Sequence, residues 1–340
     1  MLRTTALTLG LAVTGLAASP AMARAMGPGC TPEVEPVLGL AFQSRYAGSD
    51  STRSQINEQR EAEALAALKP LDSFITALTR LVEPGEDDAA REAGADCILA
   101  QMGAWARADA LAELGTETAA LTVGSRLAGL ALIAQQVWPD ASRAAPKAEV
   151  ADWLSRRVQD QMVFWETATD GAAQGNLRLW AATAAAAVGD FADDPVARGW
   201  ATWSATYVMC TADSGGAIPQ EMSRGKRALH YQLHATAPLV TTAAVLNRQG
   251  IDLRERCDGA LGRVVNFTLD EIANGGQGTM IRSGAAQTVF DGDGIESFQL
   301  AWVEPWLTLQ QDARADRLVD PMRPLSYSKL GGDLTAIWGQ

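Results

Sequence analysis

The sequence has very little histidine and cysteine, with two histidines and four cysteines among 340 residues. No Cys-x-x-Cys or His-Glu-x-x-His spacing occurs, and His230 and His234 share one segment without a third ligand beside them. The Gly-rich stretches Ser214–Gly216 and Asn274–Gly278 lack the strand-then-helix context of a nucleotide-binding loop, which indicates turns. We therefore expect no metal site and no other cofactor.

Positive charge is also scarce. Lys and Arg total 28 against 40 Asp and Glu, which gives a net charge of −12. An acidic surface argues against nucleic acid and against anionic membranes as partners. It would also repel a polyanion over most of the molecule, so a cationic cleft would stand out by contrast.

Long apolar runs are missing except near the N-terminus, and even that run is too short to span a membrane. Residues 1–23 carry Arg3, then an apolar stretch, then Ala-Met-Ala before Arg24, the pattern of a secretory signal peptide. We expect cleavage after Ala23 and a periplasmic location. Loss of Arg3 changes the net charge from −12 to −13 in a mature chain of residues 24–340.

The four cysteines remain in that mature chain. An exported protein with an even number of cysteines is expected to form disulfides, here two. Of the three possible pairings we favour Cys30–Cys97 and Cys210–Cys257, because each joins neighbours along the chain and the first would hold the N-terminal arm.

Strict alternation of apolar and polar residues, the mark of half-buried strands, is nearly absent. Apolar residues instead recur at spacings of three and four, which predicts an all-α protein of antiparallel helices stacked in pairs. No shift in composition marks a boundary, so residues 24–340 are expected to form a single domain. The predicted helices are Glu61–Leu81, Ala89–Ala112, Thr118–Val137, Lys147–Thr167, Asn176–Val188, Asp194–Thr211, Pro219–Gln249, Leu253–Ile272 and Glu296–Gln311.

The most informative of these helices is Pro219–Gln249, which we expect Pro238 to kink or split. Arg224, Arg227, Tyr231 and His234 follow at spacings of 3, 4 and 3, so they are predicted to share one stripe of this helix. A phenol beside guanidinium groups suits proton transfer on a carboxylated substrate. A solvated basic face is the alternative, but the apolar remainder of the segment favours a stripe that faces a ligand.

Several stretches together resemble the alginate lyase family, the periplasmic poly(β-D-mannuronate) lyases. They run through nearly the whole mature sequence and are Ser44–Asp50, Cys97–Leu111, Gly175–Ala182, Gly216–Tyr231, Trp302–Trp306 and Leu330–Thr335. The resemblance implies an (α/α) toroid of helical hairpins around a deep cleft, with a mobile N-terminal lid. It also implies cleavage of an acidic polysaccharide, a β-1,4-linked polyuronate, by β-elimination.

The resemblance assigns roles to individual residues. It implies that Tyr231 is both base and acid, that Arg224 binds the carboxylate and that Asn176 helps to neutralise it. Arg45 falls at a basic lid position, and Tyr46 beside it is a candidate for gripping the polymer. From spacing alone, Arg227 is nearest the phenol and is expected to support its ionisation.

The family pattern has a histidine directly after the asparagine, whereas this chain has Leu177. Leucine donates no hydrogen bond and accepts no proton. Three explanations remain open: His234 supplies the missing donor, Arg178 supplies it, or the activity has weakened or shifted to another polyuronate. For His234, the alternative is a core histidine satisfied by a backbone carbonyl.

Trp180 lies in one of the matching stretches and is a candidate for stacking on sugar, although core packing is the commoner role of a tryptophan in a helical protein. A further alternative is a non-catalytic polyuronate-binding protein on a lyase scaffold. That alternative leaves Tyr231 without a purpose, so we expect a lyase. We also expect the protein to be a monomer.

Overall fold

The computed structural model describes residues 30, 34–82, 87–292 and 294–339. The predicted signal peptide, residues 1–23, lies outside this part of the chain. The helices are α1 (Glu58–Leu81), α2 (Asp88–Arg107), α3 (Glu117–Thr122), α4 (Gly124–Val137), α5 (Ala144–Thr167), α6 (Asp170–Ala173), α7 (Asn176–Phe191), α8 (Pro195–Met209), α9 (Pro219–Met222), α10 (Ala228–Arg248), α11 (Arg256–Ala273), α12 (Gln277–Ser283), α13 (Val303–Leu309), α14 (Ala313–Val319) and α15 (Leu334–Trp338).

Short 3₁₀ turns and two-residue strands complete the described secondary structure. The 3₁₀ turns are η1 (Gly225–Arg227), η2 (Thr288–Phe290), η3 (Ser297–Leu300), η4 (Asp320–Met322) and η5 (Ser328–Leu330). Strand β1 (Gly39–Leu40) pairs in parallel with β2 (Glu113–Leu114), and β3 (Ser326–Tyr327) pairs antiparallel with β4 (Gly332–Asp333). The predicted all-α class is confirmed.

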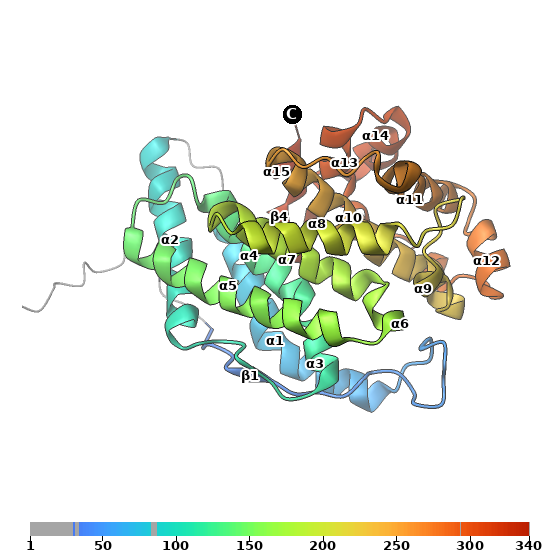
Figure 1. Ribbon diagram of the computed structural model, residues 1–340, viewed down its shortest axis with the longest axis horizontal. Coiled ribbons are helices and arrows are strands. Elements are labelled where there is room, and N and C mark those ends of the chain that lie inside the picture. The colour runs from blue at the N-terminus through green and yellow to red at the C-terminus, as the bar shows by residue number, and fades with distance from the viewer. Residues whose placement is uncertain (1–29, 31–33, 83–86, 293, 340) are drawn as a thin grey trace, which may run out of the picture.

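Helix α7 is the centre of the packing and contacts α4, α5, α8 and α10 (Figure 1). Its alanine-rich sequence is buried over nearly its whole length, including Ala181, Ala182 and Ala184–Ala187. Small side chains let neighbouring helices approach closely. At Gly124 of α4, an added Cβ would lie only 3.0 Å from the backbone nitrogen of Ala181, so a larger residue there would push α4 and α7 apart.

The predicted helix Pro219–Gln249 is interrupted at a different place from the one expected. Helix α10 continues through Pro238 without splitting, and the break lies earlier, between α9 and η1. Gly225 adopts φ +53° there, a left-handed conformation that glycine adopts readily. The expectation of a split at Pro238 was therefore wrong, and the basic residues precede α10 rather than forming part of it.

Both predicted disulfides are present. Cys30 is bonded to Cys97 of α2, and Cys210, directly after α8, is bonded to Cys257 at the start of α11. Cys257 has φ 51°, and it begins a left-handed turn through Gly259 before α11 becomes regular. The second bridge therefore joins the end of one helix to an irregular turn before another.

One described segment, Glu117–Val137, is long and apolar enough to cross a membrane by length and composition alone. Because 72% of its most apolar window is buried inside the protein, packing against α7 explains its composition. Burial and packing of this kind are those of a core helix in a folded domain.

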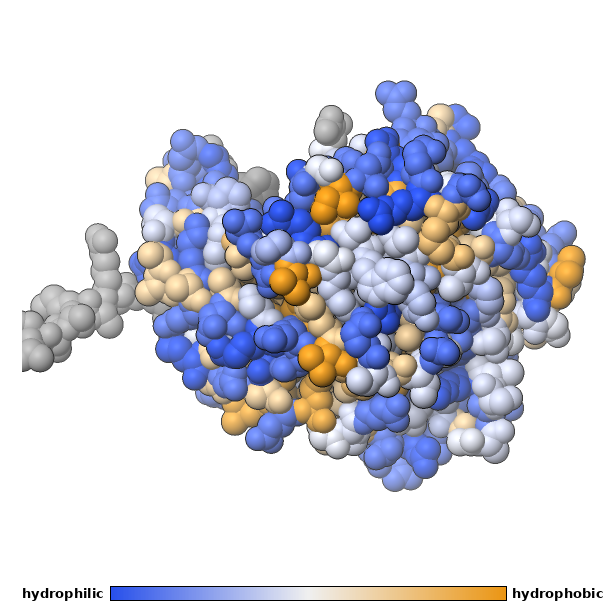
Figure 2. Space-filling view, viewed as in Figure 1, coloured by the Kyte–Doolittle hydropathy of each residue, from blue (hydrophilic) through white to orange (hydrophobic). Residues whose placement is uncertain are grey.

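The outer face of the molecule that α5 and α8 form is mainly hydrophilic, with scattered apolar side chains (Figure 2).

Candidate active site

The break before α10 gives the candidate site its shape. Glu221 lies on α9, Arg224 precedes η1, and Arg227 is the residue before the first turn of α10, which carries Tyr231. The predicted stripe along one helix was therefore wrong in its geometry. The 3₁₀ turn folds Arg224 back onto Tyr231, so that these two side chains are in direct contact.

Arg224 and Tyr231 form the core of the site. The guanidinium carbon of Arg224 lies 3.8 Å from the centre of the Tyr231 ring, close enough for a strong cation–π contact. Both side chains are buried. A fixed positive charge over the ring stabilises the negative charge that a phenol acquires when it gives up its proton.

Residues 44–56, which we call the covering segment, lie against this pair. Tyr46 and Ile56 form an isolated antiparallel bridge within it. The Tyr46 and Tyr231 hydroxyls are hydrogen-bonded to each other. The covering segment precedes α1 and is the blue loop at the lower right of Figure 1.

Arginines hold the covering segment in place. Arg224 donates from Nε to the carbonyl of Thr52 at 3.0 Å and from Nη2 to that of Arg53 at 3.1 Å. Arg227 donates from Nε to the carbonyl of Ser54 at 3.2 Å. Both predicted arginines therefore lie beside this segment.

Arg45 and Tyr46 also join the cluster. Arg45 donates to the Tyr46 hydroxyl from Nη2 at 3.1 Å and from Nε at 3.3 Å, and it pairs with Glu61 at 3.4 Å. The Tyr46 hydroxyl thus lies between a guanidinium group and the Tyr231 hydroxyl. Five of the predicted site residues lie together here, namely Arg45, Tyr46, Arg224, Arg227 and Tyr231.

Asp50 organises the covering segment from within. Its carboxylate accepts hydrogen bonds from the Thr52 hydroxyl and from the backbone N–H groups of Thr52, Ser54 and Gln55. The Thr52 hydroxyl, followed by the backbone donors, holds the pKa of Asp50 well below its usual range. The carbonyls that bind the arginines therefore belong to a turn with its own internal structure.

Asn176 reaches the site through Glu221. Asn176 is the first residue of α7, and its backbone N–H donates to Glu221 Oε1 at 2.7 Å. Its side-chain Nδ2 lies 3.1 Å from both Glu221 oxygens. Glu221 is fully buried, and Arg224 acts on its carboxylate electrostatically.

His234 lies one turn beyond Tyr231 and is half-buried, with the two ring centres 6.4 Å apart. The Trp180 indole N–H donates to His234 Nε2 at 3.1 Å. Because an indole nitrogen only donates, Nε2 must carry the lone pair, and the proton of the neutral ring lies on Nδ1. Burial, and then the charge of Lys329, hold the pKa of His234 well below its usual value. This bond is one that the His234 ring accepts, and it differs from the donation to a backbone carbonyl expected for a core histidine.

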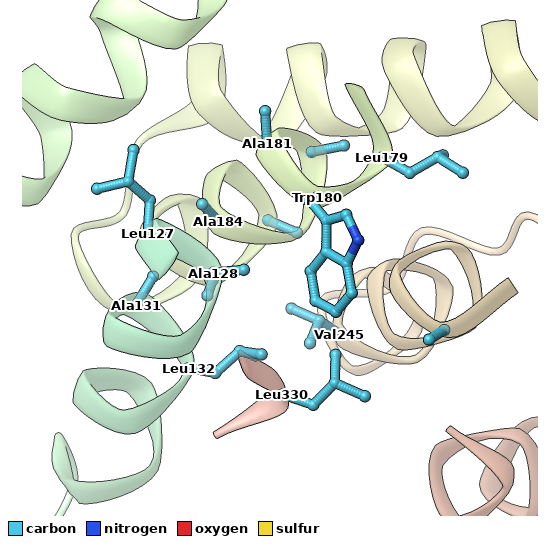
Figure 3. Close-up of a cluster of buried hydrophobic side chains, with 14 of the residues drawn as sticks. Leu127, Ala128, Ala131, Leu132, Leu179, Trp180, Ala181, Ala184, Val245 and Leu330 are labelled. Carbon is cyan, nitrogen blue, oxygen red and sulfur yellow. The ribbon is translucent and has the colours of Figure 1, made fainter. Parts of the chain in front are cut away.

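Trp180 and Arg178 are both drawn into the interior. Trp180 has no exposed surface and lies among Leu132, Val245 and Leu330 (Figure 3). This packing leaves the indole no face for a sugar, although its N–H orients His234. Sugar stacking by Trp180 is therefore not supported by its position.

Arg178 points away from the cluster, toward α5 and α8. Its three guanidinium nitrogens donate to the Ser204 hydroxyl at 3.0 Å, the Trp165 carbonyl at 3.3 Å and the Glu166 carboxylate at 2.6 Å. Residues two apart on a helix do not share a face, which separates Arg178 from Asn176. The guanidinium group of Arg178 is therefore directed away from Asn176, and it does not replace the missing histidine.

Other residues join the site that the sequence did not single out. The His230 ring lies 5.2 Å from that of Tyr231, and Lys329 acts on His234 electrostatically. The Lys329 ammonium lies 6.0 Å from the Tyr327 ring centre and makes no hydrogen bond or ion pair with any described residue. One signal in the sequence was available for each of two missed residues. Lys329 directly precedes the matching stretch Leu330–Thr335, and Glu221 lies inside the matching stretch Gly216–Tyr231.

Cations dominate this neighbourhood in an acidic protein. Burial, followed by the charges of Arg227, Arg45 and Arg224, lowers the pKa of His230 to about 4. Burial, followed by Arg126, lowers the pKa of Lys329 to about 7. A site that discourages further positive charge on its own residues is suited to an anionic ligand. Across the described ranges, no group of three His, Cys, Asp or Glu side chains is placed to hold a metal.

Comparisons with known proteins identify relatives of this chain. The alginate lyase family profile matches residues 122–277. An alginate lyase of Azotobacter chroococcum is 30% identical over 320 residues, which cover 91% of this chain and 84% of the relative. An alginate lyase of Pseudomonas entomophila is 29% identical over 318 residues, or 91% of this chain and 85% of the relative.

Solved structures show the same fold. A variant of alginate lyase A1-III complexed with a tetrasaccharide matches with a TM-score of 0.76 and 21% identity, covering 91% of this chain and 85% of the other. Alginate lyase A1-III from Sphingomonas species A1 matches with a TM-score of 0.73 and 20% identity, covering 92% and 87%. The predicted (α/α) toroid is confirmed. By sequence and fold together, this chain belongs to the alginate lyase family and is a polysaccharide lyase.

Proposed function

We propose that the protein cleaves alginate, or a closely related polyuronate, by β-elimination at the Tyr231 site. The observation that carries this proposal is the Arg224 guanidinium 3.8 Å above the Tyr231 ring, inside a cationic cluster of an acidic protein. A site for a neutral sugar would not need this charge. A site for a uronate needs both the charge and the phenol.

The chemistry explains this pairing. The proton on C5 of a uronate lies next to a carboxylate, whose negative charge makes the proton hard to remove. Cations and hydrogen-bond donors on that carboxylate stabilise the enolate-like intermediate as charge builds. A base then removes the C5 proton, and an acid protonates the leaving O4.

Tyr231 is the base and then the acid in this proposal, so the hydroxyl that takes the C5 proton returns it to O4. Arg224 supports the phenolate and provides counter-charge for the carboxylate. Asn176 contributes an amide at the start of α7. His234, neutral with its proton on Nδ1, is a donor able to stand in for the histidine missing at Leu177.

Substrate entry requires a change in the covering segment. The Tyr231 hydroxyl is bonded to Tyr46 in this structure, so a sugar reaches it only after that contact opens. Arg45, which belongs to the segment, and Arg227, which is bonded to it, then meet the polymer's own carboxylates. Lys329, whose side-chain nitrogen makes no hydrogen bond or ion pair with a described residue, is a further contact for an acidic chain.

The test is an assay of the purified mature protein on a panel of polyuronates. Each β-elimination creates an unsaturated uronate end that absorbs in the ultraviolet, so cleavage is followed directly. Absorbance that rises on polymannuronate or another polyuronate supports the proposal. Retention on immobilised polymer with no rise on any polyuronate would instead identify a non-catalytic binding protein.

A substitution at Leu177 tests which polyuronate the protein cleaves. Its side chain packs against the apolar core rather than offering a donor. Leu177→His restores the family step and is expected to raise activity on polymannuronate. If the unmodified protein cleaves a different polyuronate and this substitution leaves polymannuronate uncut, Leu177 marks a shift in specificity.

We further propose that the protein is exported to the periplasm, cleaved after Ala23, and active as a monomer. The apolar stretch after Arg3 and the two disulfides favour export. N-terminal sequencing of periplasmic material checks the cleavage site, and light scattering of the purified protein checks the oligomeric state. A mature chain that begins elsewhere than Arg24 would correct the site.

A further inference from the structure

The buried contact between Glu221 and Asn176 joins two helices at the edge of the site. Glu221 Oε1 accepts the Asn176 backbone N–H at 2.7 Å, and both carboxylate oxygens lie 3.1 Å from Asn176 Nδ2. The carboxylate also lies at the N-terminus of α7, where the helix dipole favours negative charge. Neither side chain has more than a trace of exposed surface.

This contact leaves one end of the Asn176 amide unused. With Nδ2 directed at Glu221, the side-chain oxygen Oδ1 is buried and has no hydrogen-bond partner in the described part of the chain. Buried polar atoms are nearly always paired, so this oxygen is an acceptor available to a ligand. The amide nitrogen only donates and the amide oxygen only accepts, so the two ends recognise opposite groups.

We propose that Glu221 is a positioning residue that decides which end of the Asn176 amide a bound uronate meets. An ionised Glu221 only accepts, so it holds Nδ2 and leaves Oδ1 for the ligand. A protonated Glu221 donates from its O–H to Oδ1, and the amide turns over so that Nδ2 becomes free to donate to the uronate carboxylate. The backbone N–H of Asn176 stays on the other carboxyl oxygen in both states. This inference rests on the proposed function of Asn176 at the carboxylate.

The surroundings make both states accessible. Burial raises the pKa of Glu221 to about 7, although the bonds from Asn176 and the charge of Arg224 act in the opposite direction. Arg224 is the charged side chain that acts on Glu221 across this contact. Near neutral pH the carboxyl is therefore divided between its two forms.

Among the described residues, the elements packed around α9 supply no charge to Glu221 other than that of Arg224. Helix α7 contributes the uncharged Asn176 at this point. The ionisable side chains of α10 nearest the break, His230 and Tyr231, lie beside Arg224 instead. Arg282 of α12 is paired with Asp213. The pKa of Glu221 is therefore set mainly by burial, by the hydrogen bonds from Asn176 and by the charge of Arg224.

Glu221→Gln separates the two orientations. Glutamine keeps the shape, accepts the Asn176 N–H with its carbonyl and donates to Oδ1 with its amide, so it holds Asn176 with Nδ2 free at every pH. The measurement is the ratio of kcat/KM for Glu221→Gln to that for the wild type across pH 5 to 9, on the polyuronate that the wild type cleaves. Ionisations that both proteins share, including that of Tyr231, cancel in this ratio.

We expect the ratio to be constant below about pH 6 and to rise above pH 7 by up to about tenfold per pH unit, because the wild type alone loses its donor there. Glu271→Gln is the matched control. Glu271 is also buried and accepts a backbone N–H, from Thr279, and a side-chain Nδ2, from Asn274, away from the Tyr231 cluster. Its ratio to the wild type should be flat. A flat ratio for folded Glu221→Gln overturns the inference and leaves the lyase proposal standing.

A second measurement needs neither the variant nor activity. In wild-type protein labelled with ¹⁵N-asparagine, the Asn176 side-chain amide signal, assigned by its loss in Asn176→Asp, should titrate with a midpoint near pH 7. An Asn176 signal that does not move between pH 5 and 9 also overturns the inference. Because this titration is read without substrate, it is independent of whether any polyuronate is cleaved.

Discussion

Tyr231 is the residue on which the proposed chemistry depends. Tyr231→Phe keeps the ring beneath Arg224 and removes only the hydroxyl. Turnover on the cleaved polyuronate should fall by about a hundredfold or more, because both proton transfers use that oxygen. Polymer binding should persist in a retention assay. Undiminished turnover in the variant would remove Tyr231 from the mechanism.

His234 is the second residue with a separable role. His234→Gln keeps an acceptor for the Trp180 indole N–H but removes the Nδ1 donor. We expect turnover to drop by roughly tenfold or more. The melting temperature should be nearly unchanged, because the glutamine carbonyl can accept the hydrogen bond that Trp180 donates to His234. Kinetics and thermal melts of the same preparation check this. A lower melting temperature with normal turnover would make His234 a purely structural residue.

Glu221 should give the stability of the protein a measurable pH dependence. Its pKa is about 7 in the fold and near 4.5 in the unfolded chain, so the native state binds more protons between these values. Raising the pH from about 4.5 to 7 should therefore lower the free energy of unfolding of the wild type, by up to about 3 kcal/mol relative to Glu221→Gln. Urea unfolding of both proteins across this range is the measurement. Parallel pH profiles would show that Glu221 titrates normally.

At the scale of the elements, the break between α9 and α10 positions the proposed catalytic pair, Arg224 and Tyr231. Gly225→Ala forces a side chain into a left-handed conformation at φ +53°, which should cost about 1 kcal/mol of stability. It should also reduce turnover, because the turn that folds Arg224 onto Tyr231 is strained.

Gly199→Ala on α8 is the control for that substitution. No atom lies within 4 Å of the position an added Cβ would take, so alanine there should leave activity unchanged and stabilise the helix by up to about 1 kcal/mol. Thermal melts and turnover of the two variants decide the matter. Equal effects of the two substitutions would show that the break has no special role.

At the scale of the whole molecule, the Cys210–Cys257 bridge joins the end of α8 to the start of the neighbouring α11, away from the Tyr231 cluster. Its loss in Cys210→Ala should cost about 2–4 kcal/mol, because the unfolded chain is no longer restrained across 47 residues. The melting temperature should fall while turnover at low temperature stays near normal. Cys210→Ala combined with Cys257→Ala controls for the free thiol. A large loss of turnover in the folded double variant would tie the bridge to the site.

Most of the fold and part of the site could be predicted from the sequence. Helices such as Lys147–Thr167 and Asn176–Val188 differ from α5 and α7 only at their ends, because their apolar spacing is a local property. The cluster around Tyr231 followed from a short run of unusual residues and from the family resemblance. The prediction that Arg224, Arg227, Tyr231 and His234 share one stripe assumed a continuous helix. It was wrong because Gly225 adopts a left-handed conformation that turns the chain.

By itself, the sequence determined the all-helical class and the concentration of basic residues before Tyr231, since each depends on residue types or on neighbours along the chain. It also favoured, among three possible disulfide pairings, the one that the structure shows. Only the tertiary structure decided that Arg178 and Trp180 point into the interior and that Glu221 is hydrogen-bonded to Asn176. The residues in these contacts lie far apart in sequence, 54 positions for Trp180 and His234 and 45 for Asn176 and Glu221. Which side of α7 meets which neighbour is set by how α4, α5, α8 and α10 pack around it, and helical periodicity carries no information about that choice.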